Sequence, residues 1–360
     1  TTSLVAMVPT IWLRRVSTRQ ACVLLCTAAS SQVHSDGTGF TPTPPVSIAS
    51  IKGGRDYMED EFFVAETARY KLLAVYDGHG GKKVSEYLKA NFHRAFEKSL
   101  KNNEADSSAA LVTGGTESTA SVALKNALAS VDEDMLSGPL SKKLHYQGST
   151  SCMLYLERVP SQSAGALSMN SVISANVGDS RAVLARGTTA IDLTLDHKPN
   201  DPLERSRVEG LGGSVTWHGR IDKAGKPIES TGVYRVNRNL ALSRAMGDRY
   251  MRPYVTSEPD FQHVSLTAED EFVIVATDGV WDVISSQECV TMIHQIMKEY
   301  SIVPEEVQKF SAAERKEFDV LHRAKIRNIQ DQMSSIITAI ALRRGSTDNI
   351  TVLIQWLKEE

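Results

Sequence analysis

The chain has 360 residues, enough for one large layered domain or two smaller ones. Its composition, 41% hydrophobic and 23% charged, excludes wholesale disorder and fibrous architectures. The formal net charge of −3 argues against a protein that coats nucleic acid, and no apolar stretch approaches the roughly 20 residues of a membrane-spanning helix.

The first 35 residues contain no acidic side chain but include Arg14, Arg15 and Arg19. This composition is typical of a mitochondrial targeting segment. We nevertheless favour a second interpretation, in which residues 1–46 form an extension packed on the main domain. The chain has only four cysteines, and Cys152 and Cys289 stand far from the others. The absence of a disulfide framework favours the cytoplasm, with a mitochondrion or another organelle as the alternative if the segment is a targeting remnant.

From residue 47 onward, short apolar runs end at Asp-Gly or Gly-Asp turns. They predict strands at 72–76, 172–177, 182–184, 272–277 and 350–356. The second and third are expected to form a hairpin. Helical spacing predicts helices at 84–100, 120–136 and 330–342. We expect loops or insertions at 102–117, 160–170 and 219–232, and a solvated helical excursion at 298–326. This order favours a layered α+β sandwich over an alternating doubly wound sheet.

A set of acidic residues stands at the ends of the predicted strands. A carboxylate at the end of a buried strand needs a bound cation or base, because nothing else nearby neutralises it. A single Asp-Gly is better explained as a turn, but a turn does not explain the whole set. These acids are Glu59, Asp60, Asp77, Asp179, Asp278 and Asp348.

The types of residue in the set indicate a hard cation. The chain has no His-Glu-x-x-His and no Cys-x-x-Cys motif, and oxygen ligands suit Mg²⁺ or Mn²⁺. Two such ions together with a phosphate-binding cation and a general acid are what phosphoester hydrolysis needs. Arg55 and His79 are the candidates for these two roles. An arginine near acids is more often a salt bridge, whereas a histidine between two glycines has no helix or strand neighbour to pack against.

Eight motifs in order resemble the metal-dependent, type-2C serine/threonine protein phosphatases, over about residues 47–357. The motifs are Arg55-Asp-Tyr-Met-Glu-Asp60, Asp77-Gly-His-Gly-Gly81, Gly148-Ser-Thr150, Gly178-Asp-Ser-Arg181, Asp196-His-Lys-Pro199, Ser243-Arg-Ala-Met-Gly-Asp248, Asp278-Gly-Val-Trp-Asp282 and Gly345-Ser-Thr-Asp-Asn349.

The resemblance implies a four-layer α-β-β-α sandwich of two antiparallel sheets flanked by helices, with two Mg²⁺ or Mn²⁺ ions per active site. Asp77 would bridge the two ions and the Gly78 carbonyl would bind one of them. Asp278 and Asp348 would bind the other ion, and Glu59 and Asp60 would hold waters on the ions. Arg55 would bind the substrate phosphate and His79 would be the general acid. A weaker third ion would lie at Asp179 and Asp282.

The resemblance also implies a monomer that acts on phosphorylated proteins, with a catalytic domain at 47–360 and a flap at about 196–260. This chain departs from the family by its extension, its insertions and Arg238, which stands where the family often has a glycine. Two alternatives remain open. One is a catalytically silent scaffold or binding module, which normally lacks metal carboxylates. The other is a metal-dependent phosphodiesterase or nuclease, which the net charge disfavours.

Overall fold

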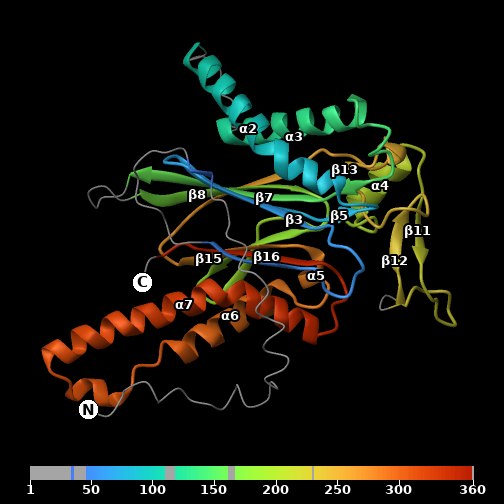
Figure 1. The fold of residues 1–360 in the computed structure, drawn as a ribbon. Coiled ribbons are helices and arrows are strands. Elements are labelled where there is room, and N and C mark those ends of the chain that lie inside the picture. The colour runs from blue at the N-terminus through green and yellow to red at the C-terminus, as the bar shows by residue number, and fades with distance from the viewer. Residues whose placement is uncertain (1–33, 36–45, 110–117, 161–166, 229–230, 359–360) are drawn as a thin grey trace. The chain divides into compact units, whose positions relative to one another are not determined.

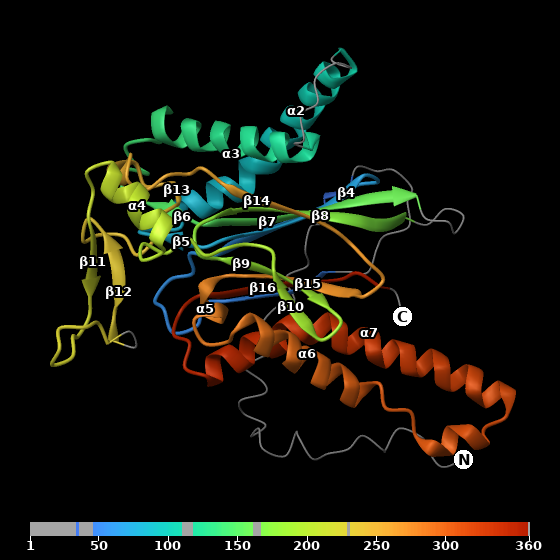
Figure 2. The same ribbon diagram turned by 180° about the vertical axis from the view of Figure 1, so that it is seen from behind.

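Two β-sheets lie face to face between two layers of helices (Figure 1, Figure 2). The computed structural model describes residues 34–35, 46–109, 118–160, 167–228 and 231–358. These residues belong to one structural unit, Val33–Glu360. The predicted four-layer α+β sandwich is confirmed.

The two main sheets, as far as the chain is described, have six and five strands. The first sheet has the order β1 (His34–Ser35), β3 (Glu61–Glu66), β4 (Tyr70–Tyr76), β7 (Ser151–Pro160), β8 (Leu167–Val177), β14 (Asp260–Ser265). The second has the order β10 (Thr189–Asp192), β9 (Arg181–Arg186), β15 (Asp270–Ala276), β16 (Ile350–Trp356), β2 (Val46–Ile51). The strand pairs are antiparallel except β1 with β3, which is parallel.

Three apolar layers hold the sandwich together. Side chains such as Leu73 and Val273 fill the space between the two sheets. Helices α2 (Lys83–Ala109) and α3 (Thr119–Ser137) cover the six-stranded sheet with residues that include Phe92. Helices α6 (Ser286–Tyr300) and α7 (Ala312–Arg343) cover the five-stranded sheet with residues that include Ile293 and Ile337. The central strands of both sheets, such as β4 and β16, are therefore buried on both faces.

The predicted hairpin at Gly178-Asp179-Ser180 is wrong, because its two strands belong to different sheets. β8 pairs with β7 and β14, whereas β9 pairs with β10 and β15. Gly178 has φ +108°, and a Cβ there would lie 2.6 Å from the Thr150 side chain. The turn thus crosses from one sheet to the other. Strands buried on both faces carry no alternation that would reveal their partner.

Other boundaries differ from the expectations in length. Residues 102–109 of the predicted insertion 102–117 continue helix α2. Pro160 and residues 167–170 of the predicted insertion 160–170 belong to strands β7 and β8. The rest of both segments, 110–117 and 161–166, lies outside the described residues. The helix predicted at 330–342 begins much earlier, at Ala312. Its start carries a capping box in which Ser311 and Glu314 bond to each other's backbone N–H.

The segment 196–260 contains α4 (Pro202–Gly210), the hairpin β11 (Val215–His218) and β12 (Val233–Val236), and the 3₁₀ helix η3 (Arg249–Met251). It has a small apolar core of its own that includes Val208, Val236 and Met251. In Figure 1 and Figure 2 the β11–β12 hairpin stands at one end of the sheets. Of the predicted extension 1–46, residues 1–33 and 36–45 lie outside the described part of the chain.

Candidate active site

The strand register brings the predicted acids to one end of the sandwich. The first residue of β3 lies opposite the last residue of β4, so Asp60 and Asp77 meet at that end. The last residue of β15 lies opposite the third residue of β16, which places Asp278 near Asp348. Strand β9 starts beside the same end of β15, just after Asp179. The charges of the other four acids all act on Asp77.

Burial and mutual repulsion dominate the electrostatics of this cluster. Asp60 is 3% exposed, and its Oδ2 accepts hydrogen bonds from Thr277 Oγ1 at 3.0 Å and Thr351 Oγ1 at 2.8 Å. Burial outweighs these bonds and raises the pKa of Asp60 to about 7. Burial, followed by repulsion from neighbouring carboxylates, raises the pKa values of Asp77 and Asp278 well above the ordinary value. The cluster is therefore short of positive charge.

The donor set fits a hard divalent cation. Within the described part of the chain, no hydrogen-bond donor reaches the buried Oδ1 atoms of Asp60 and Asp278. Buried carboxylate oxygens of this kind are stable when a cation binds them. As the side chains stand, no three Asp, Glu, His or Cys residues in the described ranges converge closely enough to hold an ion. Two cationic side chains of the chain itself, Arg55 and Lys198, contact acids of this cluster.

Arg55 is one of these cations. Its Nη2 donates to Asp348 Oδ2 at 2.5 Å, and its side chain is 57% exposed. Partial burial opposes its charge, but Asp348, Asp278 and Asp77 outweigh that effect and raise the pKa of the guanidinium. Arg55 thus stands at the exposed rim of the acidic cluster.

Asn349 holds the segment that carries Arg55 and Glu59. Its Nδ2 donates to the carbonyls of Lys52 and Tyr57 at 2.8 and 2.9 Å, and its Oδ1 accepts from the Glu59 N–H at 2.7 Å. One side chain therefore fixes both ends of the turn that precedes β3.

A second small sheet places His79. It has the order β13 (Met246–Gly247), β6 (Gly148–Ser149), β5 (Gly78–His79). His79 Nε2 lies 2.6 Å from Oδ2 of the fully buried Asp248. Burial lowers the pKa of His79, but Asp248 outweighs it and the net shift is upward. Gly148 leaves room for this pair, because a Cβ there would lie 2.0 Å from Asp248 Oδ2 and 2.4 Å from His79 Nε2.

Lys198 is the second cation of the chain at the cluster. Its Nζ donates to Asp179 Oδ2, and its side chain is 34% exposed. Burial opposes its charge, but Asp179, Asp278 and Asp282 outweigh that effect and raise the pKa of the ammonium. Asp282 is exposed. It directly follows the short helix α5 (Asp278–Trp281), one helical turn after Asp278.

The structure brings all the predicted side chains to this end of the sandwich, with Asp282 at its surface. The Gly78 backbone is buried there, and a Cβ would lie 2.5 Å from the Glu59 carbonyl. Sequence reasoning assigned no role to Asp248, Lys198 or Asn349. All three stand inside the quoted motifs, and that was the only signal available for them.

No helix in the described ranges is both long and apolar enough to cross a membrane.

Residues 46–320 match the family model described as "Protein phosphatase 2C". The chain is 34% identical over 338 residues to "Probable protein phosphatase 2C 59" of Arabidopsis thaliana, covering 91% of this chain and 86% of the relative. It is 31% identical over 310 residues to "Probable protein phosphatase 2C member 13, mitochondrial" of Oryza sativa subsp. japonica, covering 85% and 66%. The structure of serine-threonine phosphatase 2C from Toxoplasma gondii has a TM-score of 0.64 and 22% identity, covering 88% of this chain and 98% of that one.

Proposed function

Because the chain belongs to the protein phosphatase 2C family, we propose that it removes phosphate from phosphoserine and phosphothreonine in proteins by direct attack of water. Members of this family are metal-dependent protein serine/threonine phosphatases, and this chain is one of them. The observation that carries the proposed chemistry is the buried carboxylate cluster, in which Oδ1 of Asp60 and Oδ1 of Asp278 receive no hydrogen bond from the residues that the structure describes.

Two Mg²⁺ or Mn²⁺ ions would be held by Asp77, the Gly78 carbonyl, Asp278 and Asp348. Glu59 and Asp60 would hold waters on these ions. Asp179 and Asp282 would hold a weaker third ion. When bound, the ions neutralise the charge of the phosphate and lower the pKa of a water. The raised pKa values of Asp60, Asp77 and Asp278 support this assignment, because a cation is what restores their ionised form.

Arg55 and His79 would act on the substrate itself. The Arg55 guanidinium has five N–H donors, and its contact with Asp348 uses Nη2. The remaining donors are available for the phosphate oxygens. His79 contacts Asp248 through Nε2, so Nδ1 is the atom that would give its proton to the leaving serine or threonine oxygen. Asp248 stabilises the protonated ring before that transfer.

The test is the release of phosphate from a phosphoserine peptide in Mn²⁺, before and after Asp278→Asn. We expect a loss of at least about 100-fold, because a ligand carboxylate becomes neutral. Asp319→Asn, the same change at an exposed site on α7, should leave the rate unchanged. Equal rates for the wild type and Asp278→Asn, or activity that survives chelation, would contradict the proposal. A wild type that binds no Mn²⁺ would favour the scaffold alternative.

We further propose that the catalytic domain spans 47–360 with a flap at 196–260, and that 1–46 is an N-terminal extension. The protein would act on phosphoproteins as a monomer and would bind no nucleic acid. We place it in the cytoplasm, with the mitochondrion as the alternative if the extension is a targeting segment. A fluorescent fusion with and without residues 1–46 separates the two: only a targeting segment changes the location when it is removed.

A further inference from the structure

The ammonium of Lys198 contacts Asp179, one of the two carboxylates proposed to hold the third ion. Its Nζ donates to Asp179 Oδ2, and Asp179 is 4% exposed. Asp278 and Asp282 also act on the ammonium. A divalent ion at Asp179 and Asp282 would have to share these oxygens with a positive charge.

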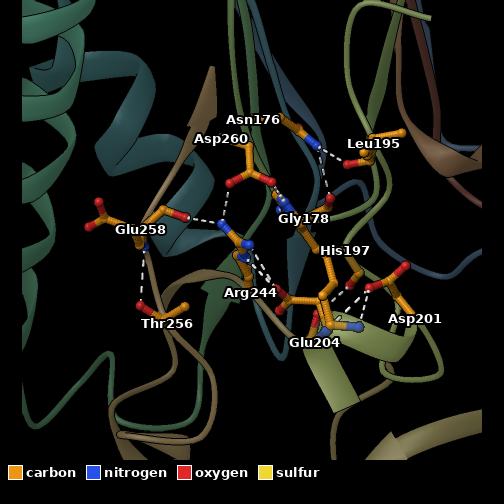
Figure 3. Close-up of polar contacts among 12 residues, drawn as sticks. Asn176, Gly178, Leu195, His197, Asp201, Glu204, Arg244, Thr256, Glu258 and Asp260 are labelled. Atoms are coloured by element: carbon orange, nitrogen blue, oxygen red, sulfur yellow. Dashed lines mark hydrogen bonds and ion pairs between the residues drawn. The ribbon is translucent and has the colours of Figure 1, made fainter. Parts of the chain in front are cut away.

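The backbone that carries Lys198 is fixed by its neighbour His197 (Figure 3). The Gly178 N–H donates to His197 Nδ1 at 3.0 Å, and the His197 N–H donates to the Gly178 carbonyl at 2.9 Å. Because Nδ1 accepts, Nε2 carries the proton and donates to Asp260 Oδ2 at 3.0 Å. The segment before Lys198 is thus tied to the residue before Asp179.

The flap completes this arrangement, as Figure 3 shows. Arg244 donates to Asp260 Oδ1 at 2.7 Å and to Glu204 Oε1 at 2.7 and 3.0 Å. Ser243 donates through both its N–H and its Oγ to the His197 carbonyl. The Lys198 backbone therefore has little freedom, while its side chain is 34% exposed and has a path to solvent.

We propose that Lys198 is a built-in counter-ion that competes with a divalent cation for the carboxylates of Asp179, Asp278 and Asp282. The inference rests on the proposed function, since it concerns the weaker third ion of the same site. The third ion enters only when the Lys198 side chain swings into solvent. Lys198 thereby sets the concentration at which the third ion binds.

The test is calorimetric titration of the full chain with Mn²⁺, comparing the wild type with Lys198→Met and Lys198→Arg. Methionine keeps the unbranched shape of the side chain, one atom shorter, and removes its charge, so the weakest binding step should tighten by about tenfold or more. Lys198→Arg keeps the charge and should bind like the wild type. Adding Asp179→Asn to Lys198→Met should abolish the gain. An unchanged or weaker last step in a folded Lys198→Met protein would overturn the proposal.

Losing the ammonium also leaves buried carboxylates uncompensated, so Lys198→Met could unfold without metal. A second measurement therefore uses the wild type. An amine-reactive label, read by peptide mass spectrometry, should modify Lys198 several-fold more at saturating Mn²⁺ than at a level that fills only the tight sites. The exposed Lys223 should not change. A constant yield at Lys198 would overturn the inference while tight Mn²⁺ binding persists, whereas a wild type that binds no Mn²⁺ overturns the proposed function instead.

Discussion

The carboxylate of Asp248 lies 2.6 Å from Nε2 of His79, although 169 positions separate the two residues in the sequence. Asp248 is fully buried, and its other oxygen, Oδ1, receives no hydrogen bond from any described residue. Its charge is therefore directed at the imidazole, where it outweighs the effect of burial and raises the pKa of His79.

Replacing Asp248 by Asn keeps the shape of this pair and removes its charge. Because the ring then holds its proton less well, we expect kcat on a phosphoserine peptide to fall by about 10- to 100-fold. The alkaline limb of the pH profile should move to lower pH. p-Nitrophenyl phosphate, whose leaving group needs no proton, should be affected little. Equal losses on the two substrates would mean that Asp248 does not act through His79.

A substitution at Gly148 tests the His79–Asp248 contact by steric means. A methyl group at Gly148 would displace both His79 and Asp248, since its Cβ would lie 2.4 Å or less from each. We expect Gly148→Ala to lower kcat by about 100-fold or more and to cost about 1–3 kcal/mol of stability. Gly210 is the matched control, because a Cβ added there would meet no described atom within 4 Å outside its own turn of helix. If Gly148→Ala keeps full activity with an unchanged Tm, the pair is not held as described.

Much of this architecture could be predicted from the sequence, because apolar runs that end in Asp-Gly locate strand ends without any knowledge of pairing. The partners of those strands could not, and the failed hairpin at Gly178 is the consequence. The Asp248–His79 contact depends on a third strand at Gly148, which joins segments far apart in the chain. The backbone conformation of Arg238, in contrast, could be predicted from the sequence. It has φ +62°, the left-handed conformation that the family's glycine at this position leads one to expect.

Arg55→Ala separates the binding of phosphate from the binding of metal. In the proposed mechanism the guanidinium binds the phosphate both before and during reaction, so we expect KM to rise by about tenfold with a small change in kcat. The same change frees the Asp348 carboxylate from its 2.5 Å contact, so Mn²⁺ affinity should stay equal or increase. Kinetics and calorimetry on one preparation measure both effects. Arg323→Ala, at an exposed site on α7, is the control. A fall in kcat alone, or weaker Mn²⁺ binding, would contradict this role.

Glu204 makes the internal structure of the flap dependent on pH, because its partners Arg207, Ser243 and Arg244 all lie within residues 196–260. It is 4% exposed, and burial alone would raise its pKa, but hydrogen bonds from Arg244, Arg207 and Ser243 outweigh burial and lower the pKa to about 2. A depressed pKa in the folded state gives stability that is fully present above the unfolded pKa of about 4.5 and is lost as the pH falls toward 2.

We therefore expect the Tm of the wild type to fall steeply between about pH 4.5 and 2, and Glu204→Gln to lower Tm at pH 7 while flattening that slope. Glu209→Gln is the matched control on the same helix, because Glu209 is exposed and pairs only with the exposed Arg205 among its described contacts. Thermal unfolding at a series of pH values measures both variants. If Glu204→Gln follows the wild-type slope in parallel, the flap network does not supply this part of the acid sensitivity. Loss of the Arg244–Glu204 bridge would then have to be compensated by the Asp260 carboxylate, which Arg244 also contacts.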